Sequence, residues 1–202
     1  MLDAAQITGV VLAGGRGLRM GGVDKGLQLY QGIPLALHAL RRLQPQVSRT
    51  VINANRHPDQ YAAFGVPVLA DEFPDFAGPL AGVATALRHC HTPFLLTVPC
   101  DSPLFPHDLA SRLAAPLAEA DCDIAMVVAP ESDAGGAPRP RTQPVFCLMR
   151  TGVLPALEAF MAGGGRKIDA WTAGQRTQPV HFDDARAFLN VNTLAELQAL
   201  RP

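Results

Sequence analysis

The stretch VLAGGRGLRMGGVDKG, residues 11–26, combines a Gly-rich backbone with the cationic side chains of Arg16, Arg19 and Lys25. An apolar run leads directly into it. Gly lets a backbone approach a ligand closely and adopt positive φ, while cations and backbone N–H groups attract an anion. The stretch therefore predicts an anion site, with phosphate as the candidate ligand.

Two better-known phosphate loops do not fit this stretch. A Walker A loop requires GxxxxGK[ST], which no window here provides. The window GRGLRM (15–20) has Met20 where the dinucleotide fingerprint GxGxxG has its third Gly. A second basic stretch, GGGRK (163–167), follows a helical pattern instead of a strand, so we interpret it as a helix-ending turn. The phosphate chemistry must belong to another class.

Short apolar runs alternate with helix-period segments along the chain, and these elements must position the loop. The predicted strands are 7–14, 50–55, 66–71, 93–101, 123–130 and 144–149, and the predicted helices are 34–43, 78–90, 108–120 and 153–161. Strands that are apolar throughout and alternate with helices indicate a mainly parallel sheet covered on both faces. The expected fold is α/β, a three-layer, mainly parallel sheet flanked by helices on both faces.

Polar groups follow four of these runs at what should be one edge of the sheet. AGGRG follows the first run, and Asn53, Asp71 and Asp101 end the next three. Ligands of such folds gather beyond the carboxyl ends of the strands. A single Asp after a strand is usually a turn residue or a helix cap, but the repeated coincidence favours a ligand site.

Two further segments carry local signals. ESDAGGAPRPRTQP (131–144) has little apolar content, and we expect either a flap over a site or a plain surface loop. TLAE (193–196) has the capping-box pattern and predicts the start of a final helix.

The composition limits the classes of function. With 202 residues the chain fits one domain over 1–202, and its net charge of −1 offers no basic field for nucleic acid or an acidic membrane surface. No run approaches the roughly 18 apolar residues of a membrane span, and the start MLDAAQ lacks signal-peptide features, so we expect a cytoplasmic protein. The four Cys form no CxxC pair, which predicts reduced thiols, and we interpret HCH (89–91) as a helix end instead of a metal cluster.

Four separated motifs arrive in order along the first half of the chain. They are VLAGGRGLRMGGVDKG, NANR (53–56), ADEFPDFAGPLAG (70–82) and PCDSPL (99–104). The first resembles the signature LAGGxxxRMGGxDK of the nucleotidyltransferase superfamily, and the set is most similar to the molybdenum cofactor guanylyltransferase family. The resemblance implies a Rossmann-like nucleotidyltransferase fold and transfer of GMP from GTP to molybdopterin, with release of pyrophosphate and with Mg²⁺ as the cofactor.

The resemblance also implies a role for each matching residue. Asp101 would bind Mg²⁺, because a hard cation takes carboxylate and phosphate oxygens, and Lys25 and Arg19 would join it as catalytic residues that offset the triphosphate charge. Asp71 and Asn53 are the candidates for recognition of the base. The carboxylate of Asp71 suits the donor edge of guanine, but it could also be a second metal ligand or a turn residue. The residues assigned to the nucleotide site are Leu12, Ala13, Gly14, Gly15, Lys25, Asn53, Asp71 and Asp101.

The pterin should lie across the C-terminal half of the cleft, while the N-terminal half binds the nucleotide. Gln143, Asn190 and Asn192 are polar residues beside apolar runs that could hydrogen-bond a pterin, although they could equally cap turns and the final helix. GTP and molybdopterin are the expected substrates, and transient contact with other molybdenum-cofactor proteins is the expected partner interaction.

Other functions remain as alternatives. A cytidylyltransferase acting on molybdopterin is the nearest, but such relatives tend to have LAAG where this chain has LAGG, so Gly14 favours guanine. A sugar-phosphate nucleotidyltransferase would need additional length. A non-catalytic GTP-binding module is disfavoured by the presence of both Lys25 and Asp101, and an NAD-binding domain is disfavoured by Met20.

Overall fold

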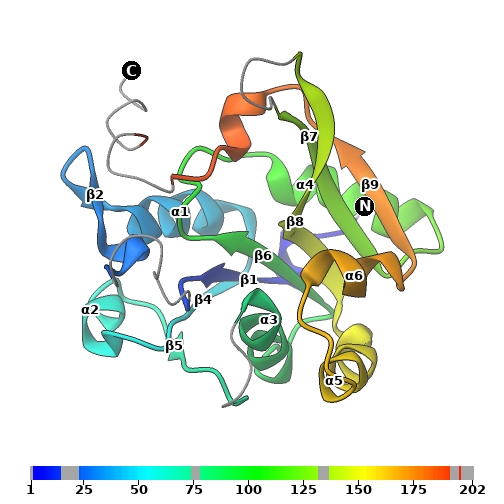
Figure 1. The fold of residues 1–202 in the computed structure, drawn as a ribbon, viewed down its shortest axis with the longest axis horizontal. Helices are drawn as coiled ribbons and strands as arrows, with labels where there is room; N and C mark the ends of the chain where they lie inside the picture. The colour runs from blue at the N-terminus through cyan, green and yellow to red at the C-terminus, as the bar shows by residue number, and fades with distance from the viewer. Residues whose placement is uncertain (1, 15–22, 74–77, 132–136, 192–195, 197–202) are drawn as a thin grey trace.

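The computed structural model describes residues 2–14, 23–73, 78–131, 137–191 and 196. Within them a seven-stranded sheet has the order β5-β4-β1-β6-β8-β7-β9 (Figure 1). Its strands are β1 (Ile7–Leu12), β4 (Arg49–Asn53), β5 (Val68–Leu69), β6 (Phe94–Pro99), β7 (Ile124–Glu131), β8 (Arg139–Arg150) and β9 (Thr177–His181). The helices are α1 (Leu35–Leu43), α2 (Pro58–Ala62), α3 (Pro79–Arg88), α4 (Leu109–Glu119), α5 (Leu154–Ala162) and α6 (Ile168–Ala173).

The sheet is mainly parallel, with one antiparallel strand. β5, β4, β1 and β6 pair in parallel, and β7 pairs with β9 in parallel, while β8 runs antiparallel to both β6 and β7. From β1 the chain first moves to β4 and β5 on one side and then crosses to β6 on the other side. Such a reversal of strand order opens a crevice at the carboxyl ends of the strands.

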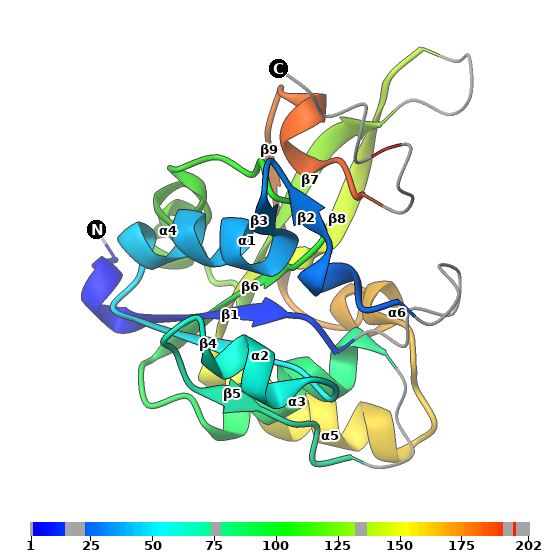
Figure 2. The same ribbon diagram turned by 90° about the vertical axis from the view of Figure 1, so that its left-hand side faces the viewer.

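Helices cover both faces of this sheet, which gives three layers (Figure 2). α1 and α4 pack on one face around Ile7, Val11 and Ile52, and the buried Tyr61 of α2 belongs to the same core. α3, α5 and α6 pack on the other face around Val10 and Leu12. Successive residues of a strand point to opposite faces, so a strand between two helical layers must be apolar throughout.

Gly9 shows how closely the layers approach. A Cβ at this position of β1 would lie 2.7 Å from Leu43 Cδ2 at the end of α1. The missing side chain lets α1 approach the central strand, because Gly in a strand interior permits a close contact that Ala would block.

A short hairpin follows the Gly-rich stretch. It consists of β2 (Leu29–Tyr30) and β3 (Ile33–Pro34), which pair antiparallel in a separate sheet. Its two turn residues, Gln31 and Gly32, have φ of 51° and 77°. Positive φ at both central positions is the type I′ conformation that matches the twist of a tight hairpin.

The predicted fold class is confirmed, and most elements lie where the patterns placed them. The prediction of a loop over 131–144 is wrong in part, because β7 continues to Glu131 and β8 begins at Arg139. The sequence analysis also missed β2, β3, α2, α6 and β9. The predicted final helix lies outside the described residues apart from Glu196.

Two smaller expectations concern the cysteines and the membrane. All four cysteines are free, and Cys100, Cys122 and Cys147 are buried. His89, within HCH, forms the C-cap of α3, as expected for a helix end. Among the described residues, no helix has the length and apolar character needed to span a membrane.

Candidate active site

A cavity of about 650 Å³ lies at the carboxyl ends of β1, β4 and β6. This size is within the usual range for a small-molecule site. The described residues that line it are Leu12, Ala13, Gly14, Lys25, Gly26, Asn53, Gly78, Pro79, Pro99, Cys100, Asp101, Gln143, Pro144, Val145, Phe146 and Asn190. The rule that ligands gather beyond strand ends therefore locates the cavity correctly.

The cavity brings most of the sequence-predicted site residues together. Leu12 is the last residue of β1, and Ala13 and Gly14 follow it. Asn53 is the last residue of β4, and Lys25 and Asp101 line the same cavity. Asp71 is not among the described lining residues, but its carboxylate accepts a hydrogen bond from Asn53, which does line the cavity. Gly15, Arg19 and Asn192 lie outside the described residues, and so does Arg16.

Lys25 and Asp101 both line the cavity and contact each other through their side chains. Lys25 Nζ donates to Asp101 Oδ2 at 3.4 Å, and the side chains are 22% and 19% exposed. Burial raises the pKa of the Asp101 carboxyl above its ordinary value, and the nearby Lys25 charge opposes this rise without cancelling it. Among the described residues, the Lys25 charge therefore offsets the burial of this carboxylate only in part.

This environment fits a hard divalent cation. One carboxylate is enough protein ligation for Mg²⁺ when phosphate oxygens and waters complete its shell. No group of three or more His, Cys, Asp or Glu side chains gathers for a metal within the described part of the chain. Asp101 is thus suited to a metal ion whose remaining ligands are phosphate oxygens and waters.

Cys100, the neighbour of Asp101, does not compete as a reactive group. Burial is the first cause that raises the pKa of its thiol well above the ordinary value, and the Asp101 charge raises it further. A neutral, buried thiol is a poor nucleophile.

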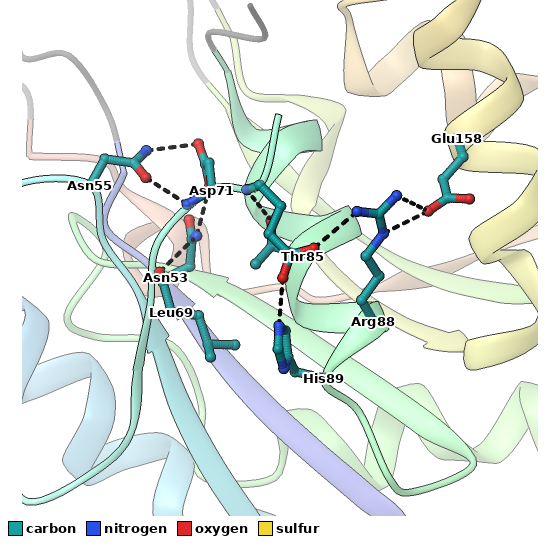
Figure 3. A network of polar contacts seen from close by, with 9 residues as sticks. Asn53, Asn55, Leu69, Asp71, Thr85, Arg88, His89 and Glu158 are labelled. Carbon is teal, nitrogen blue, oxygen red and sulfur yellow. Dashed lines mark hydrogen bonds and ion pairs between the residues drawn. The ribbon is translucent and has the colours of Figure 1, made fainter. Parts of the chain in front are cut away.

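Asn53, Asn55 and Asp71 form a closed network beside β1 (Figure 3). Asn53 Nδ2 donates to Asp71 Oδ1 at 2.8 Å and to Leu69 O at 3.2 Å. Asn55 Nδ2 donates to Asp71 Oδ2 at 2.7 Å, and the Asp71 N–H returns a bond of 2.7 Å to Asn55 Oδ1. Both carboxylate oxygens of Asp71 therefore orient amides at the end of β4.

Two glycines leave room for the Asn53 side chain. A Cβ on Gly82 of α3 would lie 2.2 Å from Asn53 Oδ1, and a Cβ on Gly14 would lie 3.1 Å from the same atom. Both N–H bonds of the Asn53 amide are used toward Leu69 and Asp71, and its oxygen lies against Gly82 and Gly14. Asn53 is thus held in a fixed position at the edge of the cavity that it helps to line.

The loop after Asp71 is fixed to the C-terminal end of α3 (Figure 3). Glu72 accepts from Arg88 at 2.9 Å and contacts His89 Nε2 at 2.7 Å, and its backbone N–H donates to Thr85 Oγ1 at 3.2 Å. Arg88 also pairs with Glu158 of α5. The hydrogen bond from Arg88, followed by that from His89, lowers the pKa of Glu72 below its ordinary value.

The N-terminus of α3 opens on the cavity. The sequence analysis used this stretch, within ADEFPDFAGPLAG, only for the family resemblance and gave Gly78 and Pro79 no role in the site. Gly78 is the N-cap, with φ of 142°, and Pro79 is the first helical residue. No side chain of the described residues forms a capping hydrogen bond at this end of the helix. Because Gly78 and Pro79 line the cavity, the positive end of the helix dipole is directed toward it. The Gly-Pro pair before a helical pattern was the available signal.

The opposite wall comes from a bulge in β8. Met126 of β7 pairs with Cys147 of β8, but the next residue, Val127, pairs with Gln143, so 144–146 lie outside the ladder. Thr97 of β6 stabilises the bulge, because its buried hydroxyl donates to Val145 O at 2.6 Å. Only Gln143 of this wall was predicted, because the bulge depends on pairing with distant strands.

The segment that follows the last described 3-10 turn lies against the cavity near Asp101. The Val191 N–H donates to Asp101 O at 2.8 Å, and the hydroxyl of the fully buried Ser102 donates to Asn190 Oδ1 at 2.7 Å. Two of the residues predicted for the C-terminal half, Gln143 and Asn190, therefore share the cavity with Lys25 and Asp101.

A crevice at the strand-order reversal, with a Lys–carboxylate pair and a helix N-terminus, defines the class of α/β proteins that bind a phosphorylated ligand at this edge. Within that class, the chain belongs to the MobA-like NTP transferase domain family, which it matches over residues 9–180.

Individual relatives match nearly the whole chain. The molybdenum cofactor guanylyltransferase of Methylibium petroleiphilum is 62% identical over 201 residues, which cover 99% of this chain and 98% of that protein. The protein of the same name from Bordetella petrii is 60% identical over 200 residues, covering 99% and 100%. The solved structure of molybdopterin-guanine dinucleotide biosynthesis protein A from Archaeoglobus fulgidus has a TM-score of 0.75 at 20% identity, covers 95% of each chain and shows the same fold.

Proposed function

We propose that this chain transfers GMP from GTP to molybdopterin, which forms the guanine dinucleotide cofactor and releases pyrophosphate. The observation that carries the proposal is the identity of 60% and 62%, over nearly full length, to molybdenum cofactor guanylyltransferases. The cavity supports it, because one space holds the nucleotide candidates Gly14 and Asn53 and the pterin candidates Gln143 and Asn190.

GTP would lie along the side of the cavity formed by β1, β4 and α3. The N-terminus of α3 would direct a positive dipole at the phosphates, and the backbone from Gly14 onward would provide N–H groups, since the Ala13 N–H already donates to Asn53 O at 2.8 Å. Asn53 Oδ1 would accept from the guanine edge, whose N1–H and N2–H₂ are donors. Asp71 would act through Asn53 and Asn55, which it orients by the hydrogen bonds described above.

The reaction forms a bond from a phosphate oxygen of molybdopterin to the α-phosphorus of GTP. The bond from that phosphorus to the bridging oxygen of the β-phosphate breaks, and pyrophosphate leaves with the electron pair. The attacking phosphate is already an anion, so no side chain needs to remove a proton from it. The protein has to align the two anions and offset their charge.

Lys25 would offset charge on the triphosphate, and Arg19 would do so from the Gly-rich stretch. Asp101 would hold Mg²⁺, which would supply further positive charge to the triphosphate. Lys25, which contacts Asp101 in this structure, would bind a phosphate oxygen of the triphosphate.

Gln143 and Asn190 would bind the pterin on the opposite side. Gln143 Nε2 lies 3.5 Å from Glu131 Oε2, and Asn190 is held by Ser102, so both amides are oriented before a ligand enters. Amides suit a pterin ring because its edge carries both donors and acceptors.

Equilibrium binding of GTP, CTP and ATP, each with and without Mg²⁺, tests the nucleotide assignment. We expect GTP to bind most tightly and Mg²⁺ to strengthen its binding. A preference for CTP would instead indicate a cytidylyltransferase. GTP binding without pyrophosphate release, in the presence of molybdopterin and Mg²⁺, would indicate a non-catalytic GTP-binding module.

The cellular setting follows from the same proposal. We place the chain in the cytoplasm, with transient contact to other molybdenum-cofactor proteins that deliver molybdopterin or accept the product. Fractionation of cells expressing the tagged protein, followed by crosslinking and capture of cofactor-insertion proteins, tests both statements. Recovery in the membrane fraction would refute the first, and absence of any crosslinked cofactor-insertion protein would refute the second.

A further inference from the structure

Asp24 and Tyr61 are joined inside the protein although 37 positions separate them. Tyr61 of α2 is fully buried, and its hydroxyl donates to Asp24 Oδ1 at 2.6 Å. The Gly26 N–H donates to the same oxygen at 3.1 Å. Asp24 is only 7% exposed, and within the described part of the chain its other oxygen is buried with no hydrogen-bond partner. A buried carboxylate with so few donors depends strongly on each of them.

Lys25 lies between Asp24 and Gly26, which are joined by the hydrogen bond from the Gly26 N–H to the Asp24 carboxylate. Asp24 is the N-cap of the 3-10 turn Lys25–Leu27, and the N–H that it accepts belongs to Gly26. The Asp24 carbonyl also accepts from Gln28 Nε2 at 3.3 Å. The backbone of Lys25 is therefore held on both sides, and its side chain extends from this fixed turn to Asp101.

The Tyr61 hydroxyl fits closely against the same turn. A Cβ on Gly26 would lie 2.4 Å from Tyr61 Oη and 3.3 Å from Cζ, so residue 26 must be Gly while the phenol occupies this place. Arg56, from the segment between β4 and α2, reaches the turn as well and donates to Val23 O at 3.5 Å. The segment from Arg56 to Tyr61 therefore contacts the turn at both Val23 and Asp24.

We propose that Tyr61 is a positioning residue for nucleotide binding, which acts through its hydrogen bond to Asp24 to hold Lys25 at the triphosphate site. This inference rests on the proposed function, because it assigns Lys25 to the triphosphate of GTP. Tyr61 itself does not line the cavity, so it acts on the nucleotide only through Asp24 and the turn.

The chemistry of the phenol suits this role. Burial, followed by the neighbouring Cys100 and Asp24, raises the pKa of Tyr61 well above its ordinary value. The hydroxyl therefore keeps its proton and always donates to Asp24. The ring has a separate structural function, since it packs edge-on against Phe64 with centroids 5.8 Å apart.

A Tyr61→Phe variant separates these two functions, because it keeps the ring and removes only the hydroxyl. We expect its Kd for GTP with Mg²⁺ to rise about tenfold, the size of one lost hydrogen bond to a charged group. Tyr30→Phe is the matched control, since Tyr30 is also buried and its hydroxyl contacts Gln31 at 3.2 Å. We expect its Kd to stay within about twofold of the wild-type value.

A double-mutant cycle tests whether the effect passes through Lys25. In a Lys25→Met background the turn no longer presents a cation, so adding Tyr61→Phe should change the Kd for GTP by less than about twofold. A merely structural role would give the same loss in both backgrounds, and that result would overturn the inference. If Tyr61→Phe does not fold, Asp24→Asn replaces it in the same cycle, with the same two outcomes.

The cycle also distinguishes this inference from the proposed function. Wild-type protein that fails to bind GTP would refute the proposed function and the inference together. Wild-type protein that binds GTP, with a Kd that Tyr61→Phe leaves unchanged, would refute the inference alone.

Discussion

Gly82 on α3 offers a sharp test of how the nucleotide side of the cavity is held. A Gly82→Ala substitution adds a Cβ 2.2 Å from Asn53 Oδ1, 2.9 Å from its Cγ and 3.1 Å from Leu12 Cδ2. Asn53 cannot yield easily, because it is 2% exposed and donates to both Leu69 O and Asp71. We therefore expect the new methyl group to displace the Asn53 amide from both partners.

The magnitude follows from three contributions. Overpacking and the loss of two partly buried hydrogen bonds together cost about 3 kcal/mol, and the higher helix propensity of Ala returns about 1 kcal/mol. The net loss of about 2 kcal/mol should lower the Tm by roughly 4–8 °C in a protein of this size. The Kd for GTP should rise at least about tenfold, because the base would lose the oriented acceptor.

Thermal unfolding and GTP titration measure the two effects. Gly152→Ala is the matched control, since a Cβ there meets nothing within 4 Å. Adding Asn53→Ala to Gly82→Ala should restore the Tm in part, because the clashing amide is gone, but it should not restore GTP binding. A Gly82→Ala protein as stable and as tight for GTP as Gly152→Ala would refute the reasoning.

Three further predictions concern the metal, the base and pH. Asp101→Ala should keep the fold, because burial raises the pKa of this carboxyl and disfavours its charge, but it should lower Mg²⁺-dependent turnover by at least about 100-fold; an unchanged rate would remove Asp101 from the reaction. Gly14→Ala places a Cβ 3.0 Å from Asn55 Nδ2 and 3.1 Å from Asn53 Oδ1, so GTP affinity should fall about fivefold while the Tm changes by less than about 2 °C; equal binding of GTP by both proteins would contradict this. Glu72 has a lowered pKa, first through Arg88 and then through His89, so its contribution to stability is present above the unfolded pKa of about 4.3 and is lost as pH falls through the folded value. The difference in unfolding free energy between wild type and Glu72→Gln should then shrink as the pH falls below about 4, and a difference that stays unchanged from pH 5 to pH 3 would refute the assignment.

The sequence predicts those strands and helices whose local residue pattern agrees with the burial that the fold gives them. β1 and β6 are mostly apolar and almost entirely buried, and α1 buries Leu35, Ala39 and Leu43 at helical spacing. Because these elements alternate along the chain, the strand-end rule also located the cavity and placed Asn53 and Asp101 in it. Their roles came from the resemblance to a family and not from the pattern.

Other elements depend on partners that are distant in sequence. RPRTQP, at the start of β8, has the composition of a loop, and it becomes a strand because β7 pairs with it. TQPVH, in β9, is mostly polar and lies at the sheet edge, where Pro179 is tolerated. α2 has only five residues, which is too short for a periodic signal. The contact of Tyr61 with Asp24 is invisible for the same reason, since nothing local links the two residues.

Because of the bulge in β8, the two walls of the cavity depend on different strand pairings. The wall proposed for GTP is carried by β1, β4 and α3, whereas the opposite wall is carried by a strand that stops pairing with β6 after Thr97 meets Cys147. Residues 144–146 lie outside the ladder, so changes at Pro144 and Val145 need not alter the register of the parallel strands, whereas Phe146 is buried against Phe105 and Phe188. Evolution could therefore refit this protein to a new acceptor molecule while its choice of nucleotide stayed the same.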